Sequence, residues 1–145
     1  KRDLAVYVLR VAGATTRLGP ALTLSNLDCG DASAIANARL RKAIAANGAP
    51  ACEAHEAPGV LKVGGMPMDL IAAALRIPAG RDVVNGTGLR GLWEASLEFA
   101  PPNDTTGNKP SVFTAVQEQL GLKLESSTAP LDVVVIDAIE RPSAN

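Results

Sequence analysis

Three groups of side chains in this 145-residue chain could do chemistry, and the first surrounds its only histidine. His55 lies between Glu53 and Glu56, and imidazole and carboxylate groups are ligands for Zn²⁺. A structural zinc site needs several converging ligands, and the Pro- and Ala-rich segment around His55 is followed by no second cluster. A Ser-His-Asp triad would need the same histidine, and the chain has no G-x-S-x-G nucleophile motif. We therefore expect no metal and no catalysis here, and predict a solvated loop.

The second group is the series Gly86, Gly88 and Gly91, which has the G-x-G-x-x-G spacing of a dinucleotide-binding loop. Such a loop binds pyrophosphate only where a helix begins at its last glycine. Here Leu92–Phe99 alternates between apolar and polar residues, which is typical of a half-buried strand. We therefore predict that the glycines form the tight turn of a β-hairpin after Val83–Val84, and expect no cofactor.

The third group is acidic. Glu94 and Glu98 are expected on the water-facing side of their strand, roughly 13 Å apart, which is wider than the carboxylate pairs of glycosidases. Asp137 shares an otherwise apolar strand face, which favours a buried structural ion pair with Arg90 or Arg141 over a functional acid. Because the nucleophile, base and orienting group of common enzymes are missing, we do not expect an enzyme.

Cys29 and Cys52 are the only cysteines, and their spacing fits neither a zinc site nor a C-x-x-C redox motif. Both stand in segments rich in Gly, Asp and Pro. An even count in such segments favours a disulfide and an oxidising compartment. The alternative is two separate buried thiols, because cysteine is among the most buried residue types.

Composition excludes several classes of partner. The chain has 14 Lys and Arg against 15 Asp and Glu, a formal net charge of −1, so no basic surface for nucleic acid is expected. Aromatic residues make up 3% of the chain, too few for a base-stacking platform. No apolar run approaches the ~20 residues that span a bilayer.

The first predicted element of the chain is a strand over Leu4–Ala12. It is apolar on both faces as far as Arg10, which suits a strand covered on both sides. Because the chain opens almost directly on it, this strand could be donated to another copy, giving a head-to-tail polymer. The residues assigned to this assembly strand are Leu4, Val6, Tyr7, Val8, Leu9 and Val11.

Residues 13–59, called the insert below, carry both cysteines. Residues 13–30 are predicted to be a loop and residues 49–58 a linker. Between them, Ala-rich residues 31–47 predict a surface helix with Asp31 as its N-cap and Asn47-Gly48 at its end.

After the insert, two helical patterns over 67–77 and 111–120 alternate with strands. The expected strands are Val60–Val63, ended by Gly64-Gly65, then Val83–Val84, Leu92–Phe99, Leu122–Glu125 and, after a turn at Ser126–Pro130, Leu131–Ile139. Residues 60–99 and 111–139 repeat the same order of elements weakly. We predict one α+β domain over residues 1–145. It has a mixed, largely antiparallel sheet of five or six strands, two helices on one face and a disulfide-tied helical insert.

Three segments carry a family signal: Leu4-Ala5-Val6-Tyr7; Thr87–Gly91 with Trp93 and Leu97-Glu98-Phe99; and Phe113–Glu125 with Val135-Ile136-Asp137 and Glu140-Arg141-Pro142. Together they resemble the soil-associated acidobacterial family of uncharacterised, mostly exported proteins. The resemblance covers residues 1–12 and 60–142, with the insert as a variable segment. Family members usually have Asp where this chain has Asn85, Pro where it has Asp82, and a longer N-terminal part. The resemblance implies an extracytoplasmic protein and no defined activity.

These observations predict a non-catalytic exported interaction or assembly module, self-associating through the donated N-terminal strand. The alternative is a monomeric extracytoplasmic domain that binds a peptide or small ligand at a sheet edge. In both cases the expected partner is a protein or small ligand, without nucleic acid, cofactor or membrane span.

Overall fold

The computed structural model describes residues 3–13, 18–101 and 107–130, and it confirms an α+β fold. The elements in chain order are β1 (Asp3–Val11), β2 (Leu22–Leu24), α1 (Ala32–Leu40), β3 (Ala54–Ala57), β4 (Val60–Pro67), α2 (Met68–Ala74), α3 (Arg76–Ala79), β5 (Val83–Asn85), β6 (Leu92–Glu98), α4 (Val112–Ala115), the π-helical turn η1 (Val116–Leu120) and β7 (Leu122–Pro130). The predicted strand Leu131–Ile139, with Asp137 and Arg141, lies outside the described residues.

The described strands form two sheets, so the prediction of one sheet was wrong. One sheet has the order β5-β1-β7 and the other has the order β2-β6-β4-β3. Within them β1 and β5 run parallel, whereas every other described pair of strands is antiparallel.

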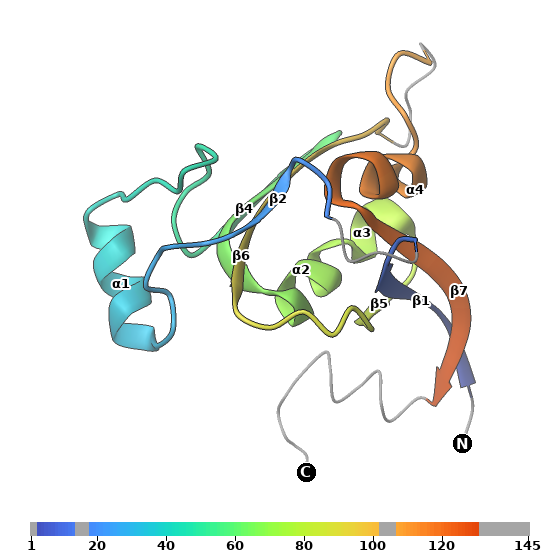
Figure 1. Cartoon of the computed structure of the whole chain (residues 1–145), viewed down its shortest axis with the longest axis horizontal. Helices are drawn as coiled ribbons and strands as arrows, with labels where there is room; N and C mark the ends of the chain where they lie inside the picture. The colour runs from blue at the N-terminus through green and yellow to red at the C-terminus, as the bar shows by residue number, and fades with distance from the viewer. Residues whose placement is uncertain (1–2, 14–17, 102–106, 131–145) are drawn as a thin grey trace.

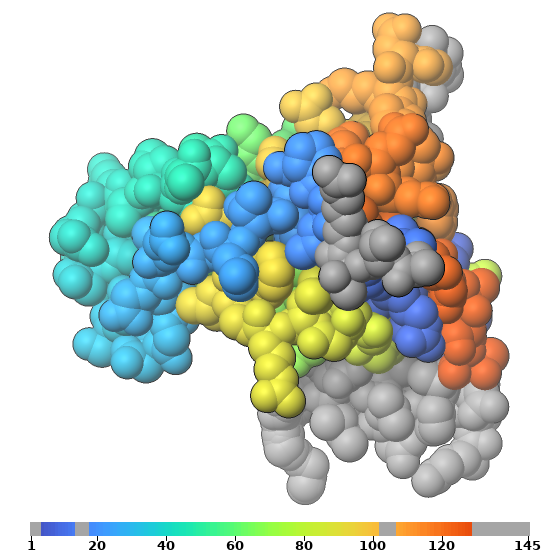
Figure 2. Space-filling view, viewed as in Figure 1, coloured from blue at the N-terminus to red at the C-terminus, as the bar shows by residue number. Residues whose placement is uncertain are grey.

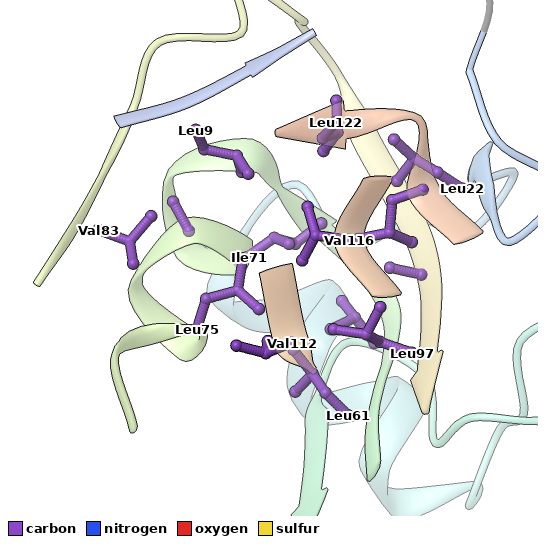
Figure 3. Packing of buried hydrophobic residues seen from close by; sticks show 14 of the residues in the cluster. Leu9, Leu22, Leu61, Ile71, Leu75, Val83, Leu97, Val112, Val116 and Leu122 are labelled. Atoms are coloured by element: carbon purple, nitrogen blue, oxygen red, sulfur yellow. The ribbon is translucent and has the colours of Figure 1, made fainter. Parts of the chain in front are cut away.

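Helices α2, α3 and α4 lie between the two sheets, whereas α1 lies apart from them at one side of the molecule (Figure 1). In Figure 3, Leu9 and Leu122 of the three-stranded sheet lie above Ile71 and Val116 of the helices, and Leu97 of the other sheet lies below them. All five side chains are at most 1% exposed. A single core between the sheets therefore fixes the helices against one face of each sheet.

The glycine-rich segment carries the chain from one sheet to the other. Val83–Asn85 pairs with β1, whereas Leu92–Glu98 pairs with β2 and β4, so the predicted hairpin between them does not form. The prediction that a strand, not a helix, follows the glycines is confirmed. Gly88 and Gly91 have φ angles of 73° and 94°, a left-handed conformation that suits glycine.

The first predicted strand is confirmed as β1, and it is the middle strand of its sheet. Alternation places Leu9 in the main core and Val6 on the opposite face with Leu4 and Val84. The turn predicted at Ser126–Pro130 was wrong, because β7 continues through these residues while it pairs with β1.

The insert supplies both outer strands of the four-stranded sheet. The loop and linker predictions missed β2 and β3, which are short and pair with β6 and β4. The predicted strand end at Gly64-Gly65 was also wrong. Gly64 has no Cβ and lets the Pro50 carbonyl come close, and Gly65, with a φ of 100°, forms a bulge inside β4.

The helix of the insert begins as predicted, because the Asp31 carboxylate accepts a hydrogen bond of 2.8 Å from the Ala34 amide. It ends at Leu40 rather than Asn47, since Lys42 turns the backbone to a φ of 51°. Figure 2 shows α1 and the residues that follow it, coloured light blue to teal, as a lobe at one side of the molecule. The predicted disulfide between Cys29 and Cys52 is present, with a Cα–Cα distance of 5.5 Å.

Candidate functional site

The candidate site lies between the tip of the β3–β4 hairpin and helices α2 and α3. Pro58 and Gly59 form the two-residue turn, because proline fixes φ near −65° and Gly59 has the φ of 81° that a type II turn needs at its second central residue. The Phe99 amide donates a hydrogen bond of 3.1 Å to the Gly59 carbonyl, which fixes the turn to the end of β6. The hairpin tip is therefore tied to the sheet.

Beneath this hairpin is a cavity of about 360 Å³, called the edge cavity below. Its lining comes from the hairpin, from α2 and α3, and from the residue after β6: Glu56, Ala57, Pro58, Gly59, Val60, Leu61, Ala74, Ile77, Pro78 and Phe99. Glu56 is the one ionisable side chain in this lining. Small-ligand sites begin at about 300 Å³ and are mostly apolar, so the edge cavity has the size and character of a small binding site.

The outer edge of β3 lies beside the edge cavity. Among the described strands, β3 has a neighbour on one side only, namely β4. The Gly64 amide donates to the Glu53 carbonyl, so by alternation residues 53, 55 and 57 bond to β4. The main-chain N–H and C=O groups of Ala54 and Glu56 then point to the outer edge, where a further strand could pair with them.

His55 lies on β3, not in a solvated loop. Alternation places it opposite Lys62 on the outer face of the sheet, whereas Glu56 shares the inner face with Leu61. Glu53 pairs with Arg39 at 3.9 Å. Residues 3–13, 18–101 and 107–130 contain no group of three or more side chains placed to hold a metal ion.

The polar side chains of the glycine-rich segment form hydrogen bonds within its turn and to α2. The Asn85 side chain accepts hydrogen bonds from the Thr87 amide at 3.0 Å and the Thr87 hydroxyl at 2.7 Å, and it donates one to Asp69 at 2.9 Å. A Cβ on Gly86 would lie 2.6 Å from a methyl group of Val8. The Asn85 hydrogen bonds therefore close the turn and join it to α2, and Gly86 lets the turn pack closely against β1.

The six residues assigned to the assembly strand all lie on β1, and their role in assembly stays a prediction. β1 pairs along nine residues with β7 on one side and with β5 on the other. One edge is therefore paired along its whole length, and the other is paired over Tyr7–Leu9 within the described residues.

Sequence reasoning missed a buried carboxylate. Glu94 is 4% exposed, not water-facing, because the insert covers its side of β6. It accepts hydrogen bonds from the Ser25 hydroxyl at 3.0 Å and from the main-chain amide of Asn47 at 3.2 Å. The Asn47 side chain donates in turn to the carbonyls of Val63 and Ala95. Glu94 thus fixes the insert to the sheet, and no local sequence signal marks it.

Replacing Glu94 with alanine should lower the free energy of unfolding by about 2 kcal/mol, because partly buried donors on Ser25 and Asn47 lose their acceptor. Urea denaturation measures this loss. Glu98→Ala is the control, since Glu98 lies on the same strand face but is exposed, and it should change stability by less than about 0.5 kcal/mol. Equal losses for both variants would contradict this role of Glu94.

A cluster of charged residues lies on β1 and β7, in the three-stranded sheet. Hydrogen bonds from Lys123 first, and from Arg10 second, lower the pKa of Glu125. The two contacts are 2.9 and 2.8 Å long. This exposed carboxylate therefore forms surface ion pairs with two cations.

Within the described residues, no helix has both the length and the apolar character required to cross a membrane. No curated protein and no solved structure matches the chain. A family model described as a protein of unknown function, DUF3738, matches residues 1–139, the insert included. This match confirms the predicted membership in an uncharacterised family, while acidobacterial origin and export stay predictions. The chain belongs to the DUF3738 family of proteins of unknown function.

Proposed function

We propose that this chain is a non-catalytic, extracytoplasmic binding module that takes up an extended segment of a partner protein at the outer edge of β3. The observation that carries the proposal is the edge cavity, which lies directly beside that edge. Main-chain groups of Ala54 and Glu56 would pair with the incoming segment, and the cavity would take one of its apolar side chains.

Burial supports an apolar anchor in the edge cavity. Ile77 lines the cavity yet is 71% exposed, so a large apolar side chain lies open to water at the cavity mouth. Covering an aliphatic side chain of this size is favourable by about 1.5–3 kcal/mol. An apolar side chain of the bound segment would be stabilised in the same way when it is buried in the edge cavity.

Extracytoplasmic location is supported by the disulfide between Cys29 and Cys52, because such bonds persist mainly in oxidising compartments. The disulfide holds the residues that precede β3, so it also supports the strand that forms the proposed binding edge.

Donation of β1 to another copy stays a prediction. Since β1 pairs at both edges within its own chain, donation would require the exchange of a whole strand between copies. The outer edge of β3 requires no exchange, and therefore we favour binding at that edge.

The test is fluorescence anisotropy with a labelled neutral heptapeptide of alternating Thr and Leu. We expect saturable binding that Ile77→Ser weakens by about tenfold, because the variant loses apolar contact at the cavity mouth. Leu40→Ser is the matched control: Leu40 is 83% exposed and ends α1, away from the edge cavity, so its loss should leave the affinity unchanged. Absence of saturable binding, or equal weakening by both variants, would overturn the proposal.

A further inference from the structure

Glu56 lies on β3 opposite Leu61. Its side chain therefore projects from the inner face of the sheet, where the core lies. It is nevertheless exposed, because β3 is the outer strand at this side of the described sheet, and it lines the edge cavity. A charge pointing inward on an outer strand opposes unselective pairing of that edge with other chains.

Glu56 has no cationic partner in the described part of the chain. The other acids near this end of the sheet are paired, Glu53 with Arg39 at 3.9 Å and Glu98 with Lys109 at 4.0 Å. Lys62 lies on the opposite face of the sheet, beside His55. The edge cavity therefore presents an apolar surface and, at its rim, one uncompensated negative charge.

We infer that the bound segment carries Lys or Arg two residues away from the apolar residue that enters the edge cavity. This inference rests on the proposed function. In a strand, residues two apart lie on the same face, about 7 Å from each other. Glu56 lines the edge cavity, so the cation and the apolar anchor must leave the same face of the incoming strand. A cation at the next position would point to the outer face, toward His55 and Lys62.

The ion pair between Glu56 and this cation determines which segments bind best, whereas apolar burial supplies most of the affinity. An exposed ion pair changes affinity about fivefold at most, and salt weakens it. Apolar burial in the edge cavity does not depend on salt in this way. Selectivity for the basic segment should therefore fall at 1 M NaCl while binding of the neutral segment persists.

Three labelled heptapeptides test this inference by fluorescence anisotropy. One is the neutral Thr-Leu peptide, the second has Arg two positions after the central Leu, and the third has Arg one position after it. We expect the second to bind about fivefold more tightly than the neutral peptide and the third to gain nothing. Equal gains for both Arg peptides would show general charge attraction and would overturn the inference.

Variants of the chain complete the test. Glu56→Gln should remove the preference and Glu56→Lys should reverse it, whereas Glu118→Gln, a matched change at an exposed acid on η1, should leave it intact. Binding of the neutral peptide without any Arg preference would overturn the inference alone. If even the neutral peptide fails to bind, the proposed function fails and the inference fails with it.

Discussion

Gly121→Ala is expected to destabilise the fold by about 3 kcal/mol or more. Gly121 ends η1 in the left-handed conformation, with a φ of 72°. An added Cβ would overlap the Gly19 nitrogen and lie 2.9 Å from backbone atoms of Leu18. Those atoms cannot move aside freely, because the Gly19 amide donates to the Leu120 carbonyl at 2.9 Å.

Gly80→Ala is the control for that variant. Gly80 also ends a helix in the left-handed conformation, with a φ of 86°, but a Cβ there would meet nothing within 4 Å. It should cost only the conformational strain of about 1–2 kcal/mol. The difference between the two variants, measured by urea denaturation, reports the contact between Gly121 and the Leu18–Gly19 segment. Equal losses would mean that this contact contributes nothing.

Loss of the disulfide in the double variant Cys29→Ser, Cys52→Ser should lower the free energy of unfolding by about 3 kcal/mol. The bond closes a loop between residues 23 positions apart, so its removal frees the unfolded chain. Both cysteines are buried in a small cluster with Ala38 and Ala51, apart from the main core. The insert therefore depends on the bond more than the two sheets do.

Amide hydrogen exchange distinguishes a local from a general effect of this loss. Exchange at Ala43 and Ala51 should become faster in the double variant, whereas exchange at Leu9 of β1 should reflect only the change in global stability. Dithiothreitol should destabilise the wild-type protein by the same amount and leave the double variant unchanged. If reduction left the free energy of unfolding of the wild type unchanged, the disulfide would not stabilise the fold.

Sequence patterns predicted the elements whose signals are local. Apolar residues on both faces predicted β1, alternation predicted β6, and the Asp31 cap is a purely local hydrogen bond. The cysteine count predicted the disulfide. In each case the residues that carry the signal are also the residues that form the structure.

The candidate site could not be predicted in the same way, because tertiary contacts form it. β3 has only four residues, Ala-His-Glu-Ala, with no strong strand pattern, and it is a strand because it pairs with β4. The Pro58-Gly59 turn was the one sequence signal that could have indicated the hairpin. The alternating pattern of β6 places Glu94 on the polar face of the strand. Glu94 is nevertheless buried, because the insert, which is distant in the sequence, covers it.

The division into two sheets was missed for a related reason. Both β5 and β6 have strand patterns, and the glycines between them are compatible with a hairpin or with a crossing between sheets. Pairing of β5 with β1 decides between the two, and that partner lies more than 70 residues away in the sequence.

The most direct test of binding at the β3 edge is a ¹H–¹⁵N titration of the full chain with the neutral Thr-Leu heptapeptide. We predict saturable shifts of the amides of Ala54, Glu56 and Ala57, accompanied by Ile77 at the mouth of the edge cavity. Shifts confined to β1 and β7, or no saturable shift at all, would contradict the account.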